Sequence, residues 1–385
     1  MTGRRPPEAR HGRRRAADPV EQRKAEHLRL AAAGEMSGAA GPGWADIRLV
    51  HHGLPRADVA AIDLSRDFLG RRLRGPLAIA AMTGGHAAAR DVNRRLAAAA
   101  ERFGLAMGVG SQRAALRNPT LASTYTVARD AAPTALLIAN VGAAQLVPQD
   151  SGPPLSPRQL ADAVSMIRAD ALAIHLNLLE EIVQPEGDRR VSGIRDAVVR
   201  AIGGLDVPVI AKETGAGLSR GLAYELRDLG FRALDVGGAG GTNFAAIETA
   251  RAKARRDARR VKLGTVYHEW GIPTAVSVAA ARAAGLPIIA TGGVRTGLDA
   301  AKAIALGATL VGVGRPLLLA ALEGDAAIDA WITQFLEELR VAVFLTGGRA
   351  IGDLAAIPKV ILGSTRAWIE DLGYADALTP AAEMS

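Results

Sequence analysis

Eight short apolar runs recur between residues 76 and 313, and each is followed closely by glycine or by a polar residue. Runs of this length are typical of strands that are buried on both faces of a parallel sheet. They occupy residues 76–82, 106–110, 135–139, 171–174, 207–211, 233–236, 286–290 and 310–313. Most of the segments between them have helical patterns bounded by glycine or proline, at residues 88–103, 157–170, 192–202, 219–229, 274–284 and 297–306.

Strands and helices that alternate eight times within about 240 residues are typical of a closed parallel barrel. A doubly wound sheet also alternates in this way, but it would not require eight units or polar residues after nearly every strand. We therefore predict an α/β fold, namely a (β/α)8 TIM barrel with an N-terminal extension. The composition suggests a disordered basic tail at residues 1–20, an N-terminal cover segment at 21–75, the barrel at 76–350 and a C-terminal tail at 351–385.

The connection between residues 241 and 274 is longer than the others. It contains a polar helical pattern at residues 245–261, with basic side chains at Arg251, Lys253, Arg255, Arg256, Arg259 and Arg260. A charge run of this kind predicts a helix whose charged face is solvated. A contact between subunits and a mobile lid are the alternatives.

Charge and composition argue against several classes of protein. Residues 1–24 carry eight basic and three acidic residues and so account for +5 of the net charge of +8, which makes a nucleic-acid partner improbable for the nearly neutral remainder. The chain has no cysteine, which excludes disulfides, thiolate zinc sites and cysteine nucleophiles and is consistent with a cytoplasmic protein. It has no apolar run of 18 residues and no apolar segment after the basic start, so we expect neither a membrane span nor a secretory signal.

The stretch at residues 175–189 turns polar immediately after a buried strand. His175 and Asn177 are two residues apart, so on a strand they face the same side. Glu180, Glu181, Glu186 and Asp188 follow, and Arg189 closes the stretch. Enclosing so many ionisable groups is costly unless they are paired or bound to a ligand, which predicts a functional site. A solvated loop with its own ion pairs is the alternative.

In a barrel of this kind the active site lies at the C-terminal ends of the strands. The loops after the seventh and eighth strands are the usual phosphate site, and glycines at Gly292, Gly293 and Gly314 would let backbone N–H groups approach a phosphate. Glycines that only make tight turns are the alternative. Lys212 could form a Schiff base, pair with an anion or contact a reduced flavin ring, and the whole set is consistent with bound flavin mononucleotide (FMN).

A second anion site is suggested by cationic and donor groups that closure of the barrel could bring together. Its members are Arg23, Lys24, Ser111, Arg113 and His175. Glu181, near Asn177, could bind Mg²⁺, which favours carboxylates beside substrate phosphates. The alternative is that Arg23 and Lys24 continue the basic tail and that His175 is a core histidine.

In these motifs the chain resembles the type 2 isopentenyl-diphosphate Δ-isomerases, which are flavin-dependent enzymes. The resemblance runs from Arg23 to about Gly348. It comprises Arg23-Lys24 with His27, Ala81-Met82-Thr83-Gly84-Gly85, Gly110-Ser111-Gln112-Arg113, Ile138-Ala139-Asn140, His175-Leu176-Asn177, Pro185-Glu186-Gly187-Asp188-Arg189, Lys212-Glu213, Gly238-Ala239-Gly240-Gly241-Thr242, Glu269-Trp270-Gly271-Ile272-Pro273-Thr274 and Gly292-Gly293-Val294-Arg295-Thr296-Gly297. Each motif alone is weak, but together and in order they are specific.

The resemblance implies an enzyme that interconverts isopentenyl and dimethylallyl diphosphate with FMN, Mg²⁺ and NADPH as the reductant of FMN, assembled as a homotetramer or homo-octamer. It implies that FMN is held by Ala81, Met82, Thr83, Ser111, Asn140, Lys212, Thr242, Gly292, Gly293, Val294, Gly314 and Arg315. It further implies that the diphosphate is held by Arg23, Lys24, Ser111, Gln112, Arg113, His175 and Asn177, and that Glu181 binds Mg²⁺. The reduced flavin would then serve as acid and base.

The chain departs from the family at one position of this site. The family has Pro-Leu-Gln-Glu after its His-x-Asn, whereas this chain has Leu178-Leu179-Glu180-Glu181. Glu180 therefore stands where the resemblance implies a proton-relaying glutamine beside the alkene, and a carboxylate can take that catalytic and substrate-binding role if its pKa is tuned. The alternatives are an isomerase-like enzyme for a different prenyl diphosphate, an FMN-dependent oxidoreductase of the 2-hydroxy-acid oxidase type, and a nucleic-acid-binding protein that uses its basic N-terminus.

Overall fold

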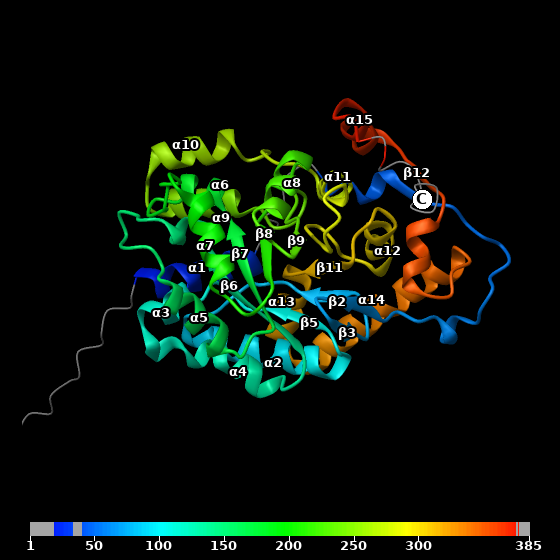
Figure 1. Cartoon of the computed structure of the whole chain (residues 1–385), viewed down its shortest axis with the longest axis horizontal. Helices are drawn as coiled ribbons and strands as arrows, with labels where there is room; N and C mark the ends of the chain where they lie inside the picture. The colour runs from blue at the N-terminus through cyan, green and yellow to red at the C-terminus, as the bar shows by residue number, and fades with distance from the viewer. Residues whose placement is uncertain (1–18, 34–40, 375, 377–385) are drawn as a thin grey trace, which may run out of the picture.

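The computed structural model describes residues 19–33, 41–374 and 376, except for the side chains of residues 19–23, 25 and 33. Eight parallel strands form a closed barrel at its centre (Figure 1). They are β4 (Leu77–Ile79), β5 (Ala106–Gly108), β6 (Leu136–Gly142), β7 (Ala171–Leu176), β8 (Val209–Glu213), β9 (Ala233–Asp235), β10 (Ile288–Thr291) and β11 (Leu310–Val313). The ring closes where β11 pairs with β4, with Val311 opposite Leu77. Each predicted apolar run is thus confirmed as one strand of the barrel.

The predicted helices surround this barrel and end within a few residues of the predicted limits. They are α2 (Ala87–Phe103), α5 (Pro157–Met166), α7 (Ile194–Gly203), α8 (Arg220–Asp228), α11 (Thr274–Arg282) and α12 (Gly297–Ala305). The structure adds α3 (Arg113–Arg117), α4 (Ser123–Ala131), α6 (Leu178–Val183), α13 (Arg315–Glu323) and α14 (Asp325–Leu345). In α5 the Ser156 side chain caps the first turn and Gln159 bonds back to the Ser156 N–H, so the sequence itself sets where this helix begins.

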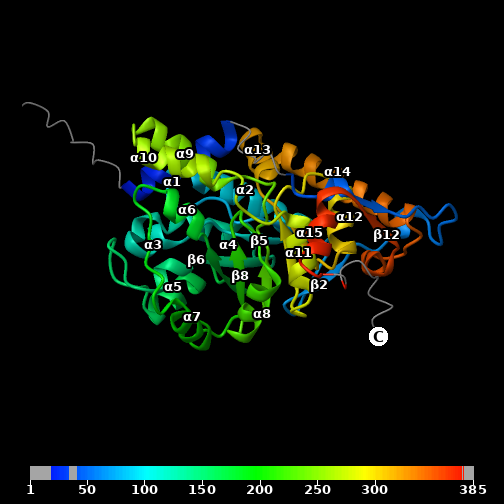
Figure 2. The same ribbon diagram turned by 90° about the horizontal axis from the view of Figure 1, so that it is seen from above.

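Two parts of the N-terminal segment cover opposite ends of the barrel. The hairpin of β2 (Arg66–Phe68) and β3 (Arg71–Leu73) inserts Phe68 and Leu73 into the core cluster at the start of the strands. The helix α1 (Pro19–Ala33) instead packs on α13 and on α9 (Phe244–Ala254), as Figure 2 shows. The side chains of α1 therefore reach the end of the barrel at which chemistry is expected.

The segment after residue 350 is folded against the N-terminal segment. It contains the 3-10 helix η5 (Ile351–Ala356), β12 (Lys359–Ile361) and α15 (Gly363–Asp371). β12 pairs antiparallel with β1 (Ile47–Leu49), so that Ile47 lies opposite Ile361 and both are buried. Residues 351–374 of the predicted C-terminal tail are therefore folded and pack against the N-terminal segment.

The long connection at residues 241–274 differs from its prediction. It forms two helices, α9 and α10 (Ala258–Val266), and the chain turns between them at Arg256, which has a φ of 58°. The expected solvated face is present at Lys253, Arg255, Arg256 and Arg259, which are exposed, but Arg251 is buried beside the buried Glu248. The pattern could not single out Arg251, because it shows which residues are charged and not which of them find charged partners elsewhere in the chain. None of the helices in the described ranges is both long enough and apolar enough to cross a bilayer.

Candidate active site

A cavity of about 710 Å³ opens at the C-terminal ends of the barrel strands. Its volume is within the range of sites for small molecules and cofactors. All the residues that the family resemblance implies for FMN line it: Ala81, Met82, Thr83, Ser111, Asn140, Lys212, Thr242, Gly292, Gly293, Val294, Gly314 and Arg315. Closure of the barrel thus brings together residues that are far apart in the sequence. Ala81 and Arg315, for example, are more than 230 positions apart and line the same cavity.

One wall of the cavity is bare backbone. Gly292 and Gly293 have φ angles of 127° and 66°, which other residues rarely adopt. A Cβ on Gly292 would lie 2.4 Å from the Thr274 Oγ1 atom, so the turn also needs glycine for space. Next to this turn α13 begins at Arg315, and the backbone N–H groups at a helix start favour an anion. These features suit a phosphate group.

The opposite side of the cavity carries a cation from the covering helix. The Lys24 ammonium on α1 donates to the Ser111 carbonyl oxygen at 2.5 Å and to the Tyr125 hydroxyl at 2.6 Å. The Tyr125 hydroxyl also donates to the Ser111 carbonyl at 2.6 Å, and burial raises the pKa of Tyr125. Lys24 therefore adds positive charge at the cavity edge, far along the chain from the glycine turn.

His175 is held in place by a chain of hydrogen bonds across two strands. Its Nδ1 atom lies 2.9 Å from the Asn140 Oδ1 atom, and the Asn140 Nδ2 atom donates to the Val109 carbonyl at 3.1 Å. The Gln112 side chain accepts the Asn140 backbone N–H at 2.9 Å and donates to the Ala163 carbonyl at 2.8 Å. His175 and Asn140 line the cavity, whereas Gln112 supports them from behind.

The remaining substrate-binding candidates differ in where they lie. Lys24, His175, Asn177 and Glu180 line the cavity with Ser111, but neither Gln112 nor Arg113 is among its lining residues. The Arg113 guanidinium is buried and lies 2.5 Å from the Asp188 carboxylate, so its charge is already balanced. The Arg23 side chain lies outside the described residues.

Glu181, the predicted Mg²⁺ ligand, is buried at the cavity wall. Its Oε1 atom accepts a hydrogen bond from the Asn177 side-chain amide at 3.1 Å, and its Oε2 atom accepts the Asp188 backbone N–H at 2.7 Å. These bonds fix the carboxylate at the mouth of the barrel. The role of Glu181 as a metal ligand remains a prediction.

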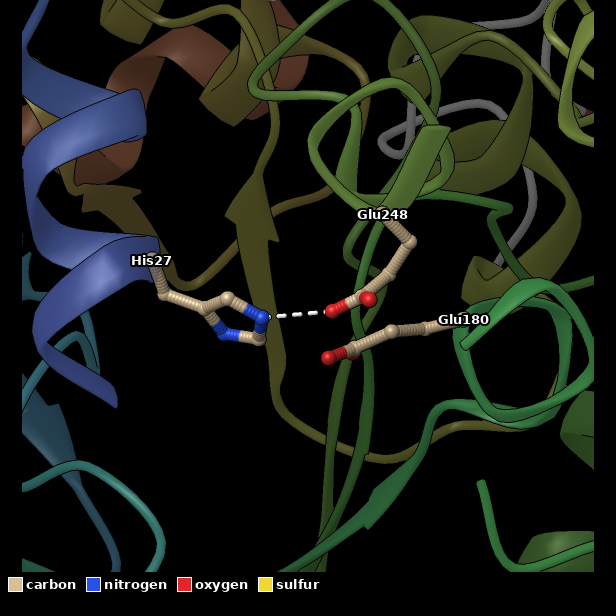
Figure 3. Close-up of side chains that lie close together, drawn as sticks. All are labelled: His27, Glu180 and Glu248. Carbon is tan, nitrogen blue, oxygen red and sulfur yellow. Dashed lines mark hydrogen bonds and ion pairs between the residues drawn. The ribbon is translucent and has the colours of Figure 1, made fainter. Parts of the chain in front are cut away.

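The side chains of His27, Glu180 and Glu248 converge from three helices, α1, α6 and α9, as Figure 3 shows. His27 and Glu180 line the cavity, and Glu248 lies behind them. We call these three residues the acid–base cluster. The His27 Nε2 atom lies 2.5 Å from the Glu248 Oε1 atom, and the Glu248 side chain is 0% exposed. Donor atoms of all three residues lie within 4.8 Å of one another, so the cluster could also accept a metal ion.

The acid–base cluster concentrates negative charge. Burial raises the pKa of Glu180 to about 7, and the Glu248 and Glu181 carboxylates act in the same direction while His27 opposes them. A carboxyl group of this kind can both hold and release a proton near neutral pH.

Arg251 supports the cluster from behind. Its guanidinium contacts three carboxylates, those of Glu248 at 2.6 Å, Glu186 at 2.7 Å and Glu26 at 2.9 Å. The Arg251 side chain is only 1% exposed. It therefore ties α9, which carries Glu248, to α1 and to the loop after α6.

Sequence reasoning missed the roles of Glu248 and Arg251, although it identified His27 within a family motif. The signal that could have found them is the i, i+3 spacing of an acid and a base in the first helix after the Gly237–Thr242 loop, at the mouth of the barrel. That spacing is common on solvated helices, so it is weak without the tertiary contacts.

Replacing Glu180 by glutamine is expected to change how stability depends on pH. The folded protein holds the Glu180 proton up to a pKa of about 7, whereas an unfolded chain releases it near 4.5. Between these values the folded state binds more protons, so the free energy of unfolding falls as the pH rises. Urea unfolding at pH 5.5 and pH 8, without added metal, should show a smaller fall for Glu180→Gln than for the unaltered chain. An equal fall in both proteins would contradict the assigned pKa.

Comparison with known proteins gives relatives along most of the chain. A protein named isopentenyl-diphosphate delta-isomerase from Methanoregula boonei is 49% identical over 356 residues, which cover 91% of this chain and 97% of the relative. A protein of the same name from Methanothermobacter thermautotrophicus is 44% identical, and the alignment covers 92% of this chain and 97% of the relative. One from Halobacterium salinarum is 46% identical, and the alignment covers 91% of this chain and 96% of the relative.

Two further comparisons concern the fold. A family model described as FMN-dependent dehydrogenase matches residues 271–358. A solved mandelate oxidase variant with a monooxide FMN adduct aligns with a TM-score of 0.59 at 17% identity, over 86% of this chain and 95% of that one. A second mandelate oxidase variant, with benzoyl-formic acid, aligns with a TM-score of 0.57 at 18% identity, over 89% and 96% of the two chains. At these identities the likeness concerns the barrel fold.

Proposed function

The chain belongs to the isopentenyl-diphosphate delta-isomerase family, and from this premise we propose that it interconverts isopentenyl diphosphate and dimethylallyl diphosphate in the barrel cavity with reduced FMN and Mg²⁺. The single observation that carries the proposal is the composition of the cavity. One wall of the cavity is the glycine turn that suits a phosphate group, and the opposite wall carries the hydrogen-bond donors Lys24 and His175. The acid–base cluster lies at the same cavity, through His27 and Glu180.

The residues present fit FMN on structural grounds. The backbone turn at Gly292 and Gly293, together with the start of α13 at Arg315, would hold the phosphate, since side chains are excluded there. Lys212 is the penultimate residue of β8 and lines the cavity, where its ammonium would stabilise negative charge on a reduced flavin ring. When bound and reduced, FMN would supply an acid and base group within a site that excludes water.

The chain's own residues would bind and orient the diphosphate. Lys24, His175 and Asn177 lie along the cavity wall opposite the glycine turn and offer cationic or neutral donors. Glu181 would bind Mg²⁺, which would supply positive charge to neutralise the diphosphate. This arrangement would point the hydrocarbon part of the substrate toward the acid–base cluster.

Allylic isomerisation needs a proton added at one carbon and removed from another, with no net redox change. The Glu180 carboxyl group can carry a proton near neutral pH, and the contact between His27 Nε2 and Glu248 Oε1 can hold a second one. We propose that Glu180 takes the relay role of the family glutamine and that Glu248 and His27 set its protonation state.

An isomerase assay tests the proposal. The purified protein is loaded with FMN, reduced anaerobically with NADPH and given isopentenyl diphosphate and Mg²⁺. Dimethylallyl diphosphate should form while the visible spectrum of the reduced flavin stays unchanged, and activity should be lost with EDTA. A protein that takes up no FMN, or that forms no product with it, would contradict the proposal.

The match to the FMN-dependent dehydrogenase model favours one second candidate, an oxidoreductase of the 2-hydroxy-acid oxidase type. The same assay separates the two, because an oxidoreductase must change the redox state of its flavin in every turnover. A different prenyl diphosphate remains a third candidate on account of Glu180. Substrates of several chain lengths, tried with the unaltered protein and with Glu180→Gln, test whether this residue sets the choice.

The assembly and location of the protein are also proposals. A homotetramer or homo-octamer in the cytoplasm, with no nucleic-acid or membrane partner, is what the family resemblance and the composition favour. Exposed apolar side chains at Val266 and Trp270, which are 68% and 64% exposed, support a contact between copies near α10. Light scattering of the purified protein would measure the assembly.

A further inference from the structure

A second, smaller cavity lies inside the barrel. Its volume is about 20 Å³, which is room for about one water molecule. Most of its lining is aliphatic or glycine, but three polar residues reach it: Lys212, Asp235 and Thr291. We call it the inner cavity. Lys212 and Thr291 line both this cavity and the larger one, whereas Asp235 lines only the inner cavity.

The strand register explains why these side chains meet. Lys212 on β8 lies directly opposite Asp235 on the neighbouring strand β9, so both side chains point to the same face. Thr291 ends β10, the next strand around the barrel. A Cβ on Gly312 of the following strand would lie only 1.9 Å from the Thr291 Oγ1 atom, so glycine at that position leaves room for the hydroxyl group.

Two of the polar atoms around the inner cavity are buried and make no hydrogen bond of normal geometry with the described residues. They are the Asp235 Oδ1 atom and the Thr291 Oγ1 atom. Asp235 is 6% exposed, and burial raises its pKa, while the Lys212 ammonium, the Thr291 hydroxyl and the Gly237 N–H oppose that effect. The Lys212 Nζ atom donates one hydrogen bond, to the Glu213 carbonyl at 2.9 Å, and has further donors to offer. Buried polar groups of this kind are normally satisfied by protein or by ordered water.

A dry inner cavity would be consistent with an apolar lining, but this one has three polar contributors, and a buried water needs two to four. We propose that the inner cavity holds one water bonded to Asp235, Thr291 and Lys212, and that Asp235 is a positioning residue that holds the Lys212 ammonium as its counter-ion next to the FMN site. This inference rests on the proposed function, because it assigns Lys212 to the FMN site.

Among the charged groups around Lys212, Asp235 is the buried carboxylate that balances the charge of its ammonium. His175 lies opposite Lys212 on β7, Glu213 is its neighbour in β8, and Asp235 lies opposite it on β9. Glu213 is already engaged, since its Oε2 atom accepts the backbone N–H groups of Thr214, Gly215 and Ala216. Removing the charge of Asp235 would therefore increase the net positive charge that Lys212 presents to the cavity.

The test measures the midpoint potential of FMN bound to the protein. Asp235→Asn keeps the shape of the side chain and removes its charge. The affinity ratio of reduced to oxidised FMN should rise about tenfold, which for a two-electron couple is a positive shift of about 30 mV. The same substitution in a Lys212→Met background should give a smaller shift, because only the direct effect of the Asp235 charge on FMN then remains.

An absent or negative shift for Asp235→Asn, or an equal shift in both backgrounds, would overturn the inference. A high-resolution crystal structure of the unaltered protein provides a second test that does not depend on the variants. It should contain one water within hydrogen-bonding distance of the Asp235, Thr291 and Lys212 side chains, and a dry inner cavity would overturn the inference. A protein that binds no FMN at all would instead contradict the proposed function, and the crystal structure would still decide the water.

Discussion

Glu248→Gln is expected to lower kcat by about 100- to 10,000-fold, which is the range for the loss of a positioned acid or base. Glu248 is fully buried and touches the imidazole of His27 at the cavity, so glutamine would keep the shape and remove the group that exchanges a proton. KM for the diphosphate should change little, because the donors for that group lie elsewhere. Steady-state kinetics with FMN-saturated protein would measure both constants.

Glu186→Gln is the matched control for this substitution. Like Glu248, Glu186 accepts a hydrogen bond from the Arg251 guanidinium, at 2.7 Å compared with 2.6 Å. Neither glutamate lines the cavity, but Glu248 contacts His27, which does line it. If both variants lost the same factor in kcat, the effect would come from the support by Arg251, and the role of Glu248 in proton transfer would be wrong.

Arg251→Met is expected to destabilise the protein by about 3–5 kcal/mol, because removing one partner of a buried ion pair leaves an uncompensated charge. Glu248 is 0% exposed and would keep its carboxylate without the guanidinium that balances it. The contacts between α9 and α1 through Glu26 would be lost as well. Urea unfolding followed by circular dichroism, at fixed pH and without FMN, would measure the difference.

Arg255→Met provides the comparison on the same helix face. Arg255 also reaches Glu186 and Glu26, at 3.1 Å and 3.9 Å, but its side chain is 42% exposed. Exposed pairs contribute about 0–1 kcal/mol, so this variant should unfold almost as the unaltered protein does. If Arg251→Met and Arg255→Met lowered the free energy of unfolding equally, the burial of Arg251 would not explain its contribution to stability.

The barrel could be predicted from the sequence because its signals are local. A strand buried on both faces is a short apolar run, and glycine at its end marks the turn into the next helix. The run at β11, residues 310–313, matches the observed strand in full. The FMN candidates lie at strand ends, so a correct strand assignment also brought them to one cavity.

The acid–base cluster could not be predicted in the same way, because its contacts join distant segments. His27 and Glu248 are 221 positions apart, and no local pattern distinguishes Glu248 from the charged residues around it. Gln112 and Arg113 failed to reach the cavity for a related reason. α3 begins at Arg113, with Gln112 as its N-cap directly after Ser111, so the chain turns and directs both side chains away from the cavity edge.

The position of His27 on the first described helix also bears on how the protein is made. During translation, α1 with Lys24 and His27 leaves the ribosome long before α9 is synthesised. The ion pairs that hold α1 in place are made by Glu248 and Arg251 of α9. Contacts over such a separation form late, because the intervening chain must first be ordered. The opening helix is therefore expected to dock last, and a nascent chain released before α9 would have no competent proton-transfer machinery, however well its early strands had formed.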